Sequence, residues 1–240
     1  MSEKENMERV EINGLLVYPF TSKENLISLI NEKKGILIAI NARKIYLATD
    51  NTRKIINDNI GYADGVGALY VLKKKGYKNA VKIAGCELWL DIIRATWEQN
   101  KSYYFIGGKQ DVIDRVIVNL KKDFPNINIV GYRNGYIKND ERKALIEDVC
   151  SKRPDYVFVA MGSPIQEILM DELLKQHKAV YQGLGGSFDV YVGDAQRAPQ
   201  WVVEHNMEGP YRIIQHFGIA RLKRSWILVK FYINALLGRY

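Results

Sequence analysis

The amino-acid sequence predicts an α/β fold, and two patterns along the chain carry this prediction. From Gly35 onward, short apolar runs rich in β-branched and aromatic residues alternate with segments of helical periodicity. Continuous apolar strands separated by helices are typical of a mostly parallel sheet that is covered on both faces. The second pattern is a basic amphipathic stretch near the C-terminus. We therefore expect a Rossmann-like sheet flanked by helices, followed by a helical appendage.

Several of the expected strands end in glycine or a small residue just before a helical segment begins. The strands span residues 35–40, 102–107, 126–131, 155–162 and 179–186. The helical segments lie near residues 65–75, 86–99, 109–123, 139–151 and 163–177. A chain of 240 residues suits one large domain with an addition. We expect an α/β domain over residues 1–208 and the appendage over residues 209–240.

The composition excludes several classes of protein. A hydrophobic content of 47 % with 26 % charged residues is ordinary for a globular domain. Residues 1–8 are polar and include no apolar signal region, and no apolar run reaches the ~18 residues of a bilayer span. Cys86 and Cys150 lie far apart, without the spacing of a zinc site. We therefore expect a reduced cytoplasmic protein that neither crosses a membrane nor relies on disulfides.

The net charge of +8 is concentrated at the C-terminus, because six of the 35 basic residues and none of the 27 acidic residues follow Glu208. An apolar stripe at helical spacing runs through this tail, comprising Leu222, Trp226, Val229, Ile233 and Leu237. Basic residues flank the stripe. This pattern favours binding to an anionic membrane surface, where each nearby Lys or Arg adds about 1 kcal/mol. The alternative is a helix packed on the core or at a dimer interface. No nucleic-acid recognition motif is present.

Three glycine-rich turns follow expected strands, and they predict a ligand with phosphate groups. In open α/β sheets, ligands bind beyond the carboxyl ends of the strands, where helix N-termini offer free N–H groups. The three candidate phosphate cradles are Gly107-Gly108, Gly162-Ser163-Pro164 and Gly183-Leu184-Gly185-Gly186-Ser187. No GxGxxG opens the first βα unit and no GxxxxGK[ST] occurs, which removes the main support for a dehydrogenase or a P-loop NTPase.

Asp64 is the candidate for chemistry, because a carboxylate beside Gly65 at the ligand edge can act as a general base. The alternative is that Asp64 only caps the following helix. Asn41 follows the strand at 35–40, where it can bind a sugar or merely cap a turn. Gln166 and Glu167 lie in the first turn of a helix, from which either can reach a ligand, although a glutamate there is also simply stabilising.

We expect no metal. The histidines His177, His205 and His216 show no metal-binding spacing, and the DxD triplet by which many sugar-nucleotide enzymes hold a divalent ion is absent. The charge of a bound diphosphate must then be met by helix N-termini and by cations. The candidate cations are Lys82, Arg197 and the arginines of the tail.

Taken together, seven segments resemble the WecG/TagA/CpsF glycosyltransferases, glycosyltransferase family 26. The segments are NARKI (41–45), YADG (62–65), KIAGCELW (82–89), FIGGK (105–109), NIVGYRNGYI (128–137), VAMGSPIQE (159–167) and GLGGSFDVYVGDAQRAPQW (183–201). They occur in the family's order, and the likeness covers roughly residues 9–215. The forms AxNAxK, YADG and AMGSPxQE are closer to the N-acetylmannosaminuronate transferases of enterobacterial common antigen than to the wall-teichoic-acid enzymes, which usually have VPDG.

The resemblance implies an inverting, metal-independent transferase that needs no cofactor. It would move a hexose from a UDP-sugar to the 4-hydroxyl of N-acetylglucosamine on undecaprenyl diphosphate, at the cytoplasmic face of the membrane, in cell-surface polysaccharide synthesis. By the same resemblance, Asp64 is the general base, Asn41 and Gln166 contact the sugars, and the glycine-rich turns hold UDP. The appendage would close over the site, with arginines near the diphosphates, namely Arg212, Arg221 and Arg224.

Departures from the family pattern leave the donor open. Lys82 replaces a common Arg, Arg43 replaces a common Glu, and MEGPYR (207–212) replaces the usual LEWLYR. The predicted donor is UDP-N-acetylmannosaminuronate, with UDP-N-acetylmannosamine, UDP-glucose or UDP-glucuronate as alternatives. A different class of function, a non-catalytic UDP-sugar or lipid-binding module, also stays open. The family often self-associates, although no stripe in this sequence identifies an interface.

Overall fold

The computed structural model describes residues 8–138, 140–196, 199, 202 and 219–240, and in the last range the side chains from residue 226 onward. Its centre is a six-stranded, entirely parallel sheet in the order β4-β3-β8-β7-β5-β6. The strands are β3 (Gly35–Ile40), β4 (Ile60–Ala63), β5 (Ser102–Gly107), β6 (Asn128–Arg133), β7 (Tyr156–Ala160) and β8 (Val180–Gly183). The predicted α/β class is confirmed.

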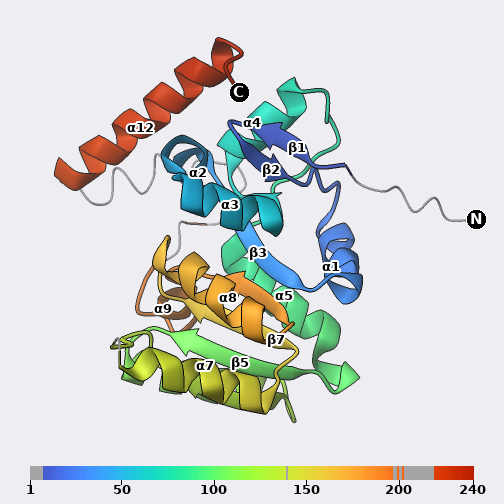
Figure 1. Cartoon of the computed structure of the whole chain (residues 1–240), viewed down its shortest axis with the longest axis vertical. Coiled ribbons are helices and arrows are strands. Elements are labelled where there is room, and N and C mark those ends of the chain that lie inside the picture. The colour runs from blue at the N-terminus through green and yellow to red at the C-terminus, as the bar shows by residue number, and fades with distance from the viewer. Residues whose placement is uncertain (1–7, 139, 197–198, 200–201, 203–218) are drawn as a thin grey trace, which may run out of the picture.

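Helices cover both faces of the sheet (Figure 1). One face packs against α3 (Asp50–Asp58), α4 (Val66–Lys74), α7 (Glu141–Lys152) and α8 (Ile165–Gln176). The other face packs against α1 (Lys23–Glu32), α5 (Gly85–Thr96), α6 (Gln110–Asp123) and α9 (Ser187–Tyr191). A short 3-10 helix, η1 (Trp97–Gln99), extends α5. Both faces of β3, β4, β5, β7 and β8 are buried, which explains why these strands are apolar without alternation, whereas the edge strand β6 is half-buried to exposed.

The strand predictions at 35–40 and 102–107 are confirmed, whereas β6 begins and ends two residues later than the predicted 126–131. Strands β7 and β8 are shorter than predicted, because the glycine turns that follow them do not pair. Strand β4 was not predicted. It has only four residues, and its Gly61 allows the backbone of Leu16 to approach, since a Cβ at Gly61 would lie 2.8 Å from the Leu16 carbonyl oxygen.

A two-stranded hairpin, β1 (Val10–Ile12) and β2 (Leu15–Val17), precedes the sheet. Its turn is Asn13-Gly14, with φ of 51° and 76°, the left-handed pair that a tight hairpin turn requires. The Asn13 side chain donates to the Ile45 carbonyl oxygen at 2.8 Å, in the short helix α2 (Ala42–Leu47). The hairpin thereby supports the region that follows β3.

The C-terminal helix α12 (Ile219–Leu236) lies across α2 and α4 (Figure 1). Phe231 and Ala235 are buried, and Phe231 fits against Gly67 of α4, where a Cβ would lie 2.9 Å from its ring. The Lys74 ammonium donates to the carbonyl oxygens of Ala235 and Leu236 at 2.7 and 2.9 Å, which caps the end of the helix.

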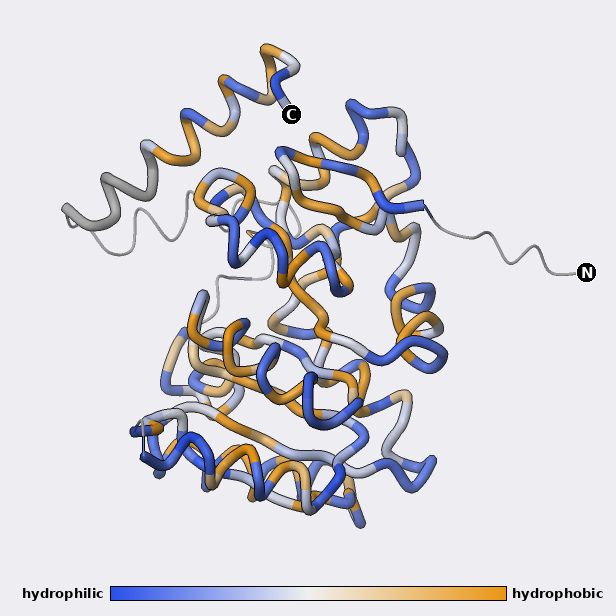
Figure 2. Tube along the Cα trace, viewed as in Figure 1, coloured by the Kyte–Doolittle hydropathy of each residue, from blue (hydrophilic) through white to orange (hydrophobic). Residues whose placement is uncertain are grey.

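The predicted apolar stripe lies on the opposite side of α12. Its described members Trp226, Val229, Ile233 and Leu237 are between 45 % and 61 % exposed. Figure 2 shows apolar and polar residues alternating along this helix. The sequence left open a packed helix or an exposed apolar face, and α12 has both, on opposite sides. Within the described part of the chain, no helix is long and apolar enough to span a bilayer.

Candidate active site

Four neighbouring strands end at one edge of the sheet and bring the predicted site residues together. Asn41 follows β3, Asp64 follows β4, and glycine turns follow β7 and β8. The Asp64 N–H donates to the Ile40 carbonyl oxygen at 2.8 Å, which fixes Asp64 beside the end of β3. The edge therefore has the position that ligands occupy in open parallel sheets.

Asp64 does not cap the helix that follows it. The residue at the N-cap of α4 is Gly65, and no side chain caps that helix. The Asp64 carboxylate instead accepts a long hydrogen bond of 3.5 Å from the Gly85 N–H, at the start of α5. A helix N-terminus favours a negative charge, so this contact stabilises an ionised carboxylate. The structure therefore removes the alternative that Asp64 caps α4, and its role as a general base stays a prediction.

Asn41 is the N-cap of α2, where its Oδ1 accepts from the Lys44 N–H at 3.0 Å. The capping alternative is thus confirmed for the amide oxygen. Capping also fixes the side chain at the sheet edge, because the N-cap backbone is extended and already bound into the helix start. Contact between Asn41 and a sugar stays a prediction.

Gln166 is buried and connects two of the glycine turns through hydrogen bonds. Its Oε1 accepts from the Gly162 N–H at 3.1 Å and from the Gly185 N–H at 2.9 Å. These two N–H groups, which the sequence predicts to hold phosphate, therefore point at Gln166 instead. Between them, the peptide Ser163-Pro164 is cis. Gln166 positions the two turns, and a direct contact with sugar stays a prediction.

Glu167 is buried beside Gln166 and forms an ion pair with Lys44 at 2.8 Å. The pair joins the first turn of α8 to α2, the helix that Asn41 caps. The second carboxylate oxygen, Oε2, is buried without a hydrogen-bond partner among the described residues. Glu167 therefore depends on Lys44 for compensation of its charge.

We expect Lys44→Met to lower the free energy of unfolding by about 3 kcal/mol, because removal of one partner leaves a buried charge unpaired. Urea unfolding followed by circular dichroism measures the loss. Lys175→Met is the matched control, because Lys175 is an exposed lysine that pairs with Asp171 on α8, the helix that carries Glu167, and this change should leave the midpoint unchanged. Equal midpoints for both variants would show that the Lys44 pair is unimportant.

The remaining glycine turns, after β5 and β8, differ in backbone conformation and in exposure to solvent. Gly107 and Gly108 have left-handed φ values of 140° and 66°, which let the backbone bend from β5 into α6. Gly186 is exposed at the N-cap of α9 and carries no side-chain cap. The Ser187 hydroxyl is buried and donates to the Leu184 carbonyl oxygen at 2.6 Å, so its proton is used within the turn. Binding of UDP at these turns stays a prediction.

The predicted cations are only partly within the described residues. Lys82 is half-buried, one residue before Ile83, whose N–H donates to the Ala63 carbonyl oxygen at 2.9 Å, and this places Lys82 near Asp64. Arg197 and Arg212 lie outside the described residues. Arg221 and Arg224 lie in the part of α12 whose side chains are not described. In the described chain, no group of three or more His, Cys, Asp or Glu side chains is arranged to hold a metal ion.

Sequence reasoning missed two buried polar side chains behind Asp64, Tyr62 on β4 and Gln182 on β8. Both are completely buried, and the Tyr62 hydroxyl and the Gln182 Oε1 have no hydrogen-bond partner among the described residues. Burial raises the pKa of Tyr62 well above its usual value of 10, and the Asp64 charge raises it further. Gln182 opposes the rise, although its geometry falls short of a hydrogen bond to the phenol. The only signal in the sequence is that each is polar within an apolar strand.

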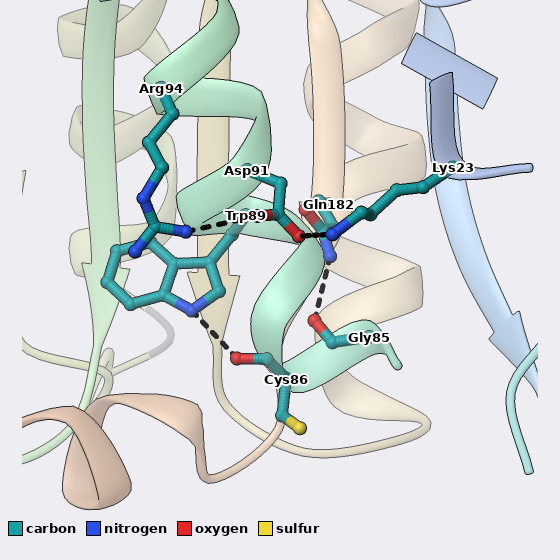
Figure 3. Close-up of polar contacts among 7 residues, drawn as sticks. All are labelled: Lys23, Gly85, Cys86, Trp89, Asp91, Arg94 and Gln182. Carbon is teal, nitrogen blue, oxygen red and sulfur yellow. Dashed lines mark hydrogen bonds and ion pairs between the residues drawn. The ribbon is translucent and has the colours of Figure 1, made fainter. Parts of the chain in front are cut away.

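Two surface hollows among the described residues lie away from this edge. One, of about 500 Å³, lies between α1 and α5, where Lys23 and Arg94 both pair with Asp91 (Figure 3). Another, of about 370 Å³, is lined by residues of α7 and α8. Both are shallow, and neither contacts Asp64. We therefore assign the candidate active site from the strand ends and their polar contacts.

Comparison with known proteins finds the same family that the sequence motifs indicate. The model of the glycosyl transferase WecG/TagA/CpsF family matches residues 10–239. Two curated relatives share the name N-acetylglucosaminyldiphosphoundecaprenol N-acetyl-beta-D-mannosaminyltransferase. The one from Bacillus spizizenii is 35 % identical over 175 residues, which cover 72 % of this chain and 66 % of the relative. The one from Bacillus subtilis is 33 % identical over 181 residues, which cover 75 % and 69 %. The match thus spans about two thirds of each relative.

Proposed function

The chain belongs to the WecG/TagA/CpsF family of glycosyl transferases, and on this premise we propose that it transfers a hexose from a UDP-sugar to N-acetylglucosaminyl-diphospho-undecaprenol. The acceptor is its 4-hydroxyl, and the reaction proceeds with inversion and without a metal. The names of the two relatives support this acceptor. The observation that carries the proposal is the Asp64 carboxylate, held at the sheet edge by the Gly85 N–H instead of capping its own helix.

In the proposed mechanism, Asp64 accepts the proton of the acceptor hydroxyl as the hydroxyl oxygen attacks the anomeric carbon. The bond from that carbon to the UDP oxygen breaks on the opposite face, so the configuration inverts. UDP leaves with the bonding electron pair, and its added negative charge is met by Lys82 and by the arginines of the tail. A general base contributes roughly 10²- to 10⁴-fold to the rate of such a step.

Two donors are favoured by different observations. The motif forms around Asn41 and Asp64 favour N-acetylmannosaminuronate, whereas the names of both Bacillus relatives favour N-acetylmannosamine. Arg43, which is exposed beside Asn41, is a candidate partner for the carboxylate of a uronate. The donors are distinguished by the rate of UDP release in the presence of a short-chain acceptor.

If the donor is the uronate, Arg43→Glu should lower kcat/KM about fivefold, since an exposed charge pair is worth at most about 1 kcal/mol. The rate with UDP-N-acetylmannosamine should change less than about twofold. UDP release with each donor, measured for wild type and variant, checks this. Equal losses with the two donors would remove Arg43 from donor selection, and turnover of N-acetylmannosamine alone would exclude the uronate.

We place the enzyme on the inner face of the plasma membrane, bound through α12. The exposed stripe on that helix supports this location, and so does the excess of basic residues after Glu208. On an anionic bilayer the stripe would enter the headgroup region, with Lys230 and the other tail cations toward the lipid phosphates. The site residues near α2 and α4 would then face a substrate that is anchored in the same membrane.

A further inference from the structure

Gln182 is an unusual side chain for its position in the sheet. It lies on β8, between β3 and β7, and it is completely buried. A buried amide is unfavourable unless its groups are hydrogen-bonded. Its Nε2 donates to the Gly85 carbonyl oxygen at 3.0 Å, whereas its Oε1 has no partner among the described residues (Figure 3). Among the described residues, the Gln182 side chain thus makes one hydrogen bond, to the start of α5.

Gly85 connects this contact to the base. Its carbonyl oxygen accepts from Gln182, and its N–H donates to Asp64 Oδ1 at 3.5 Å. No side chain is tolerated at this point, because a Cβ would lie 2.8 Å from the Tyr62 hydroxyl and 3.2 Å from the Ala39 Cβ. The first turn of α5 therefore lies directly on β3 and β4. Its orientation decides where the Gly85 N–H points.

A second side chain holds the same turn. The Trp89 indole N–H donates to the Cys86 carbonyl oxygen at 3.0 Å (Figure 3). The Trp89 ring packs edge-on against Phe158 and Phe188. Two consecutive carbonyl groups at the start of α5 thus accept from buried side chains. Gln182 ties the turn to the centre of the sheet, and Trp89 ties it to the core on that face.

From these contacts we infer that Gln182 is a positioning residue for Asp64, acting through the peptide of Gly85. By fixing the first turn of α5, Gln182 keeps the Gly85 N–H directed at the carboxylate, and the carboxylate stays in the orientation that receives the proton of the acceptor. Gln182 itself touches no substrate. This inference rests on the proposed function, since it assigns Asp64 as the base.

The test measures kcat and KM of Gln182→Met, with a UDP-sugar and a short-chain acceptor, in wild-type and Asp64→Asn backgrounds. We expect kcat to fall about tenfold, because small misplacement of a catalytic group is costly, while KM for the UDP-sugar and the affinity for UDP stay within twofold. In the Asp64→Asn background, Gln182→Met should have no further effect, because residues that act as a unit are not additive.

Two further variants keep the test decisive. Gln182→Asn retains an amide but is too short to reach Gly85, and it should give the same loss if the methionine variant does not fold. Thr96→Val removes a buried hydroxyl at the far end of α5, which bonds Tyr103 at 2.8 Å, and it should lower stability without lowering kcat.

An unchanged kcat in both Gln182 variants, or equal losses with and without Asp64, would overturn the positioning role. Absence of transfer by the wild type would instead overturn the proposed function, so the two failures are distinguishable.

Discussion

Asp64→Asn should lower kcat by about 10²-fold or more, because the amide can no longer accept the proton of the acceptor hydroxyl. The fold should survive the change, since the Asn Oδ1 can still accept from the Gly85 N–H that now contacts the carboxylate. The affinity for UDP should also be retained. The rate of UDP release measures the loss of activity. Thermal unfolding of the same samples shows whether the fold is retained.

Asp148→Asn is the matched control. This carboxylate is also partly buried and accepts from the Tyr104 hydroxyl at 2.6 Å, but it lies on α7, away from the ends of β3 and β4. Its kcat should stay within about twofold of wild type, because it touches none of the proposed machinery. If Asp64→Asn retained more than a tenth of wild-type activity, Asp64 would not be the base. If wild type and Asp64→Asn both bound UDP but neither showed turnover, the protein would be better explained as a non-catalytic binding module.

The second large effect is expected on the outer face of α12. Changing Trp226 and Ile233 to Glu should lower partition into anionic liposomes at least tenfold, since a fully buried apolar side chain of this size contributes about 1.5–3 kcal/mol. The two residues are 61 % and 49 % exposed, so the fold should tolerate the change. Flotation with vesicles of phosphatidylglycerol and phosphatidylcholine measures the partition.

Activity with a long-chain lipid acceptor should fall together with partition, whereas activity with a short-chain, water-soluble acceptor should not change. Val118→Glu is the control, because Val118 is 66 % exposed on α6 and belongs to no apolar face of α12. If the double variant floated like the wild type, the membrane assignment would be wrong. A change of mass in sedimentation with unaltered flotation would instead identify the stripe as an interface between two copies.

The fold was largely predictable because its central strands are apolar on both faces. GILIAI (35–40) and SYYFIG (102–107) have the observed bounds, since burial on both sides leaves no alternation to misread. The hairpin at Asn13-Gly14 and the strand β4 were missed, because runs of three or four residues carry too little periodicity. Their structure is fixed by contacts with β3 and α3, which local patterns do not contain.

The site was predictable only as far as strand ends determine it. Asp64 and Asn41 follow adjacent parallel strands, so their nearness follows from topology. The contacts of Asp64 with the start of α5 and of Gln182 with Gly85 depend on how α5 packs on the sheet, and no spacing in the sequence encodes that. The same holds for Gln166, whose amide oxygen takes the N–H groups of Gly162 and Gly185 that we had assigned to phosphate.

The most direct test of the proposed function is mass-spectrometric detection of the lipid product. A short-chain N-acetylglucosaminyl diphospholipid is offered a panel of UDP-sugars without added metal, with Asp64→Asn as the control. We expect one donor to add a single hexose residue, N-acetylmannosamine or its uronate, and the variant to form product more slowly by about 10²-fold or more. Absence of product from every donor, by a protein that binds UDP, would contradict the proposed reaction.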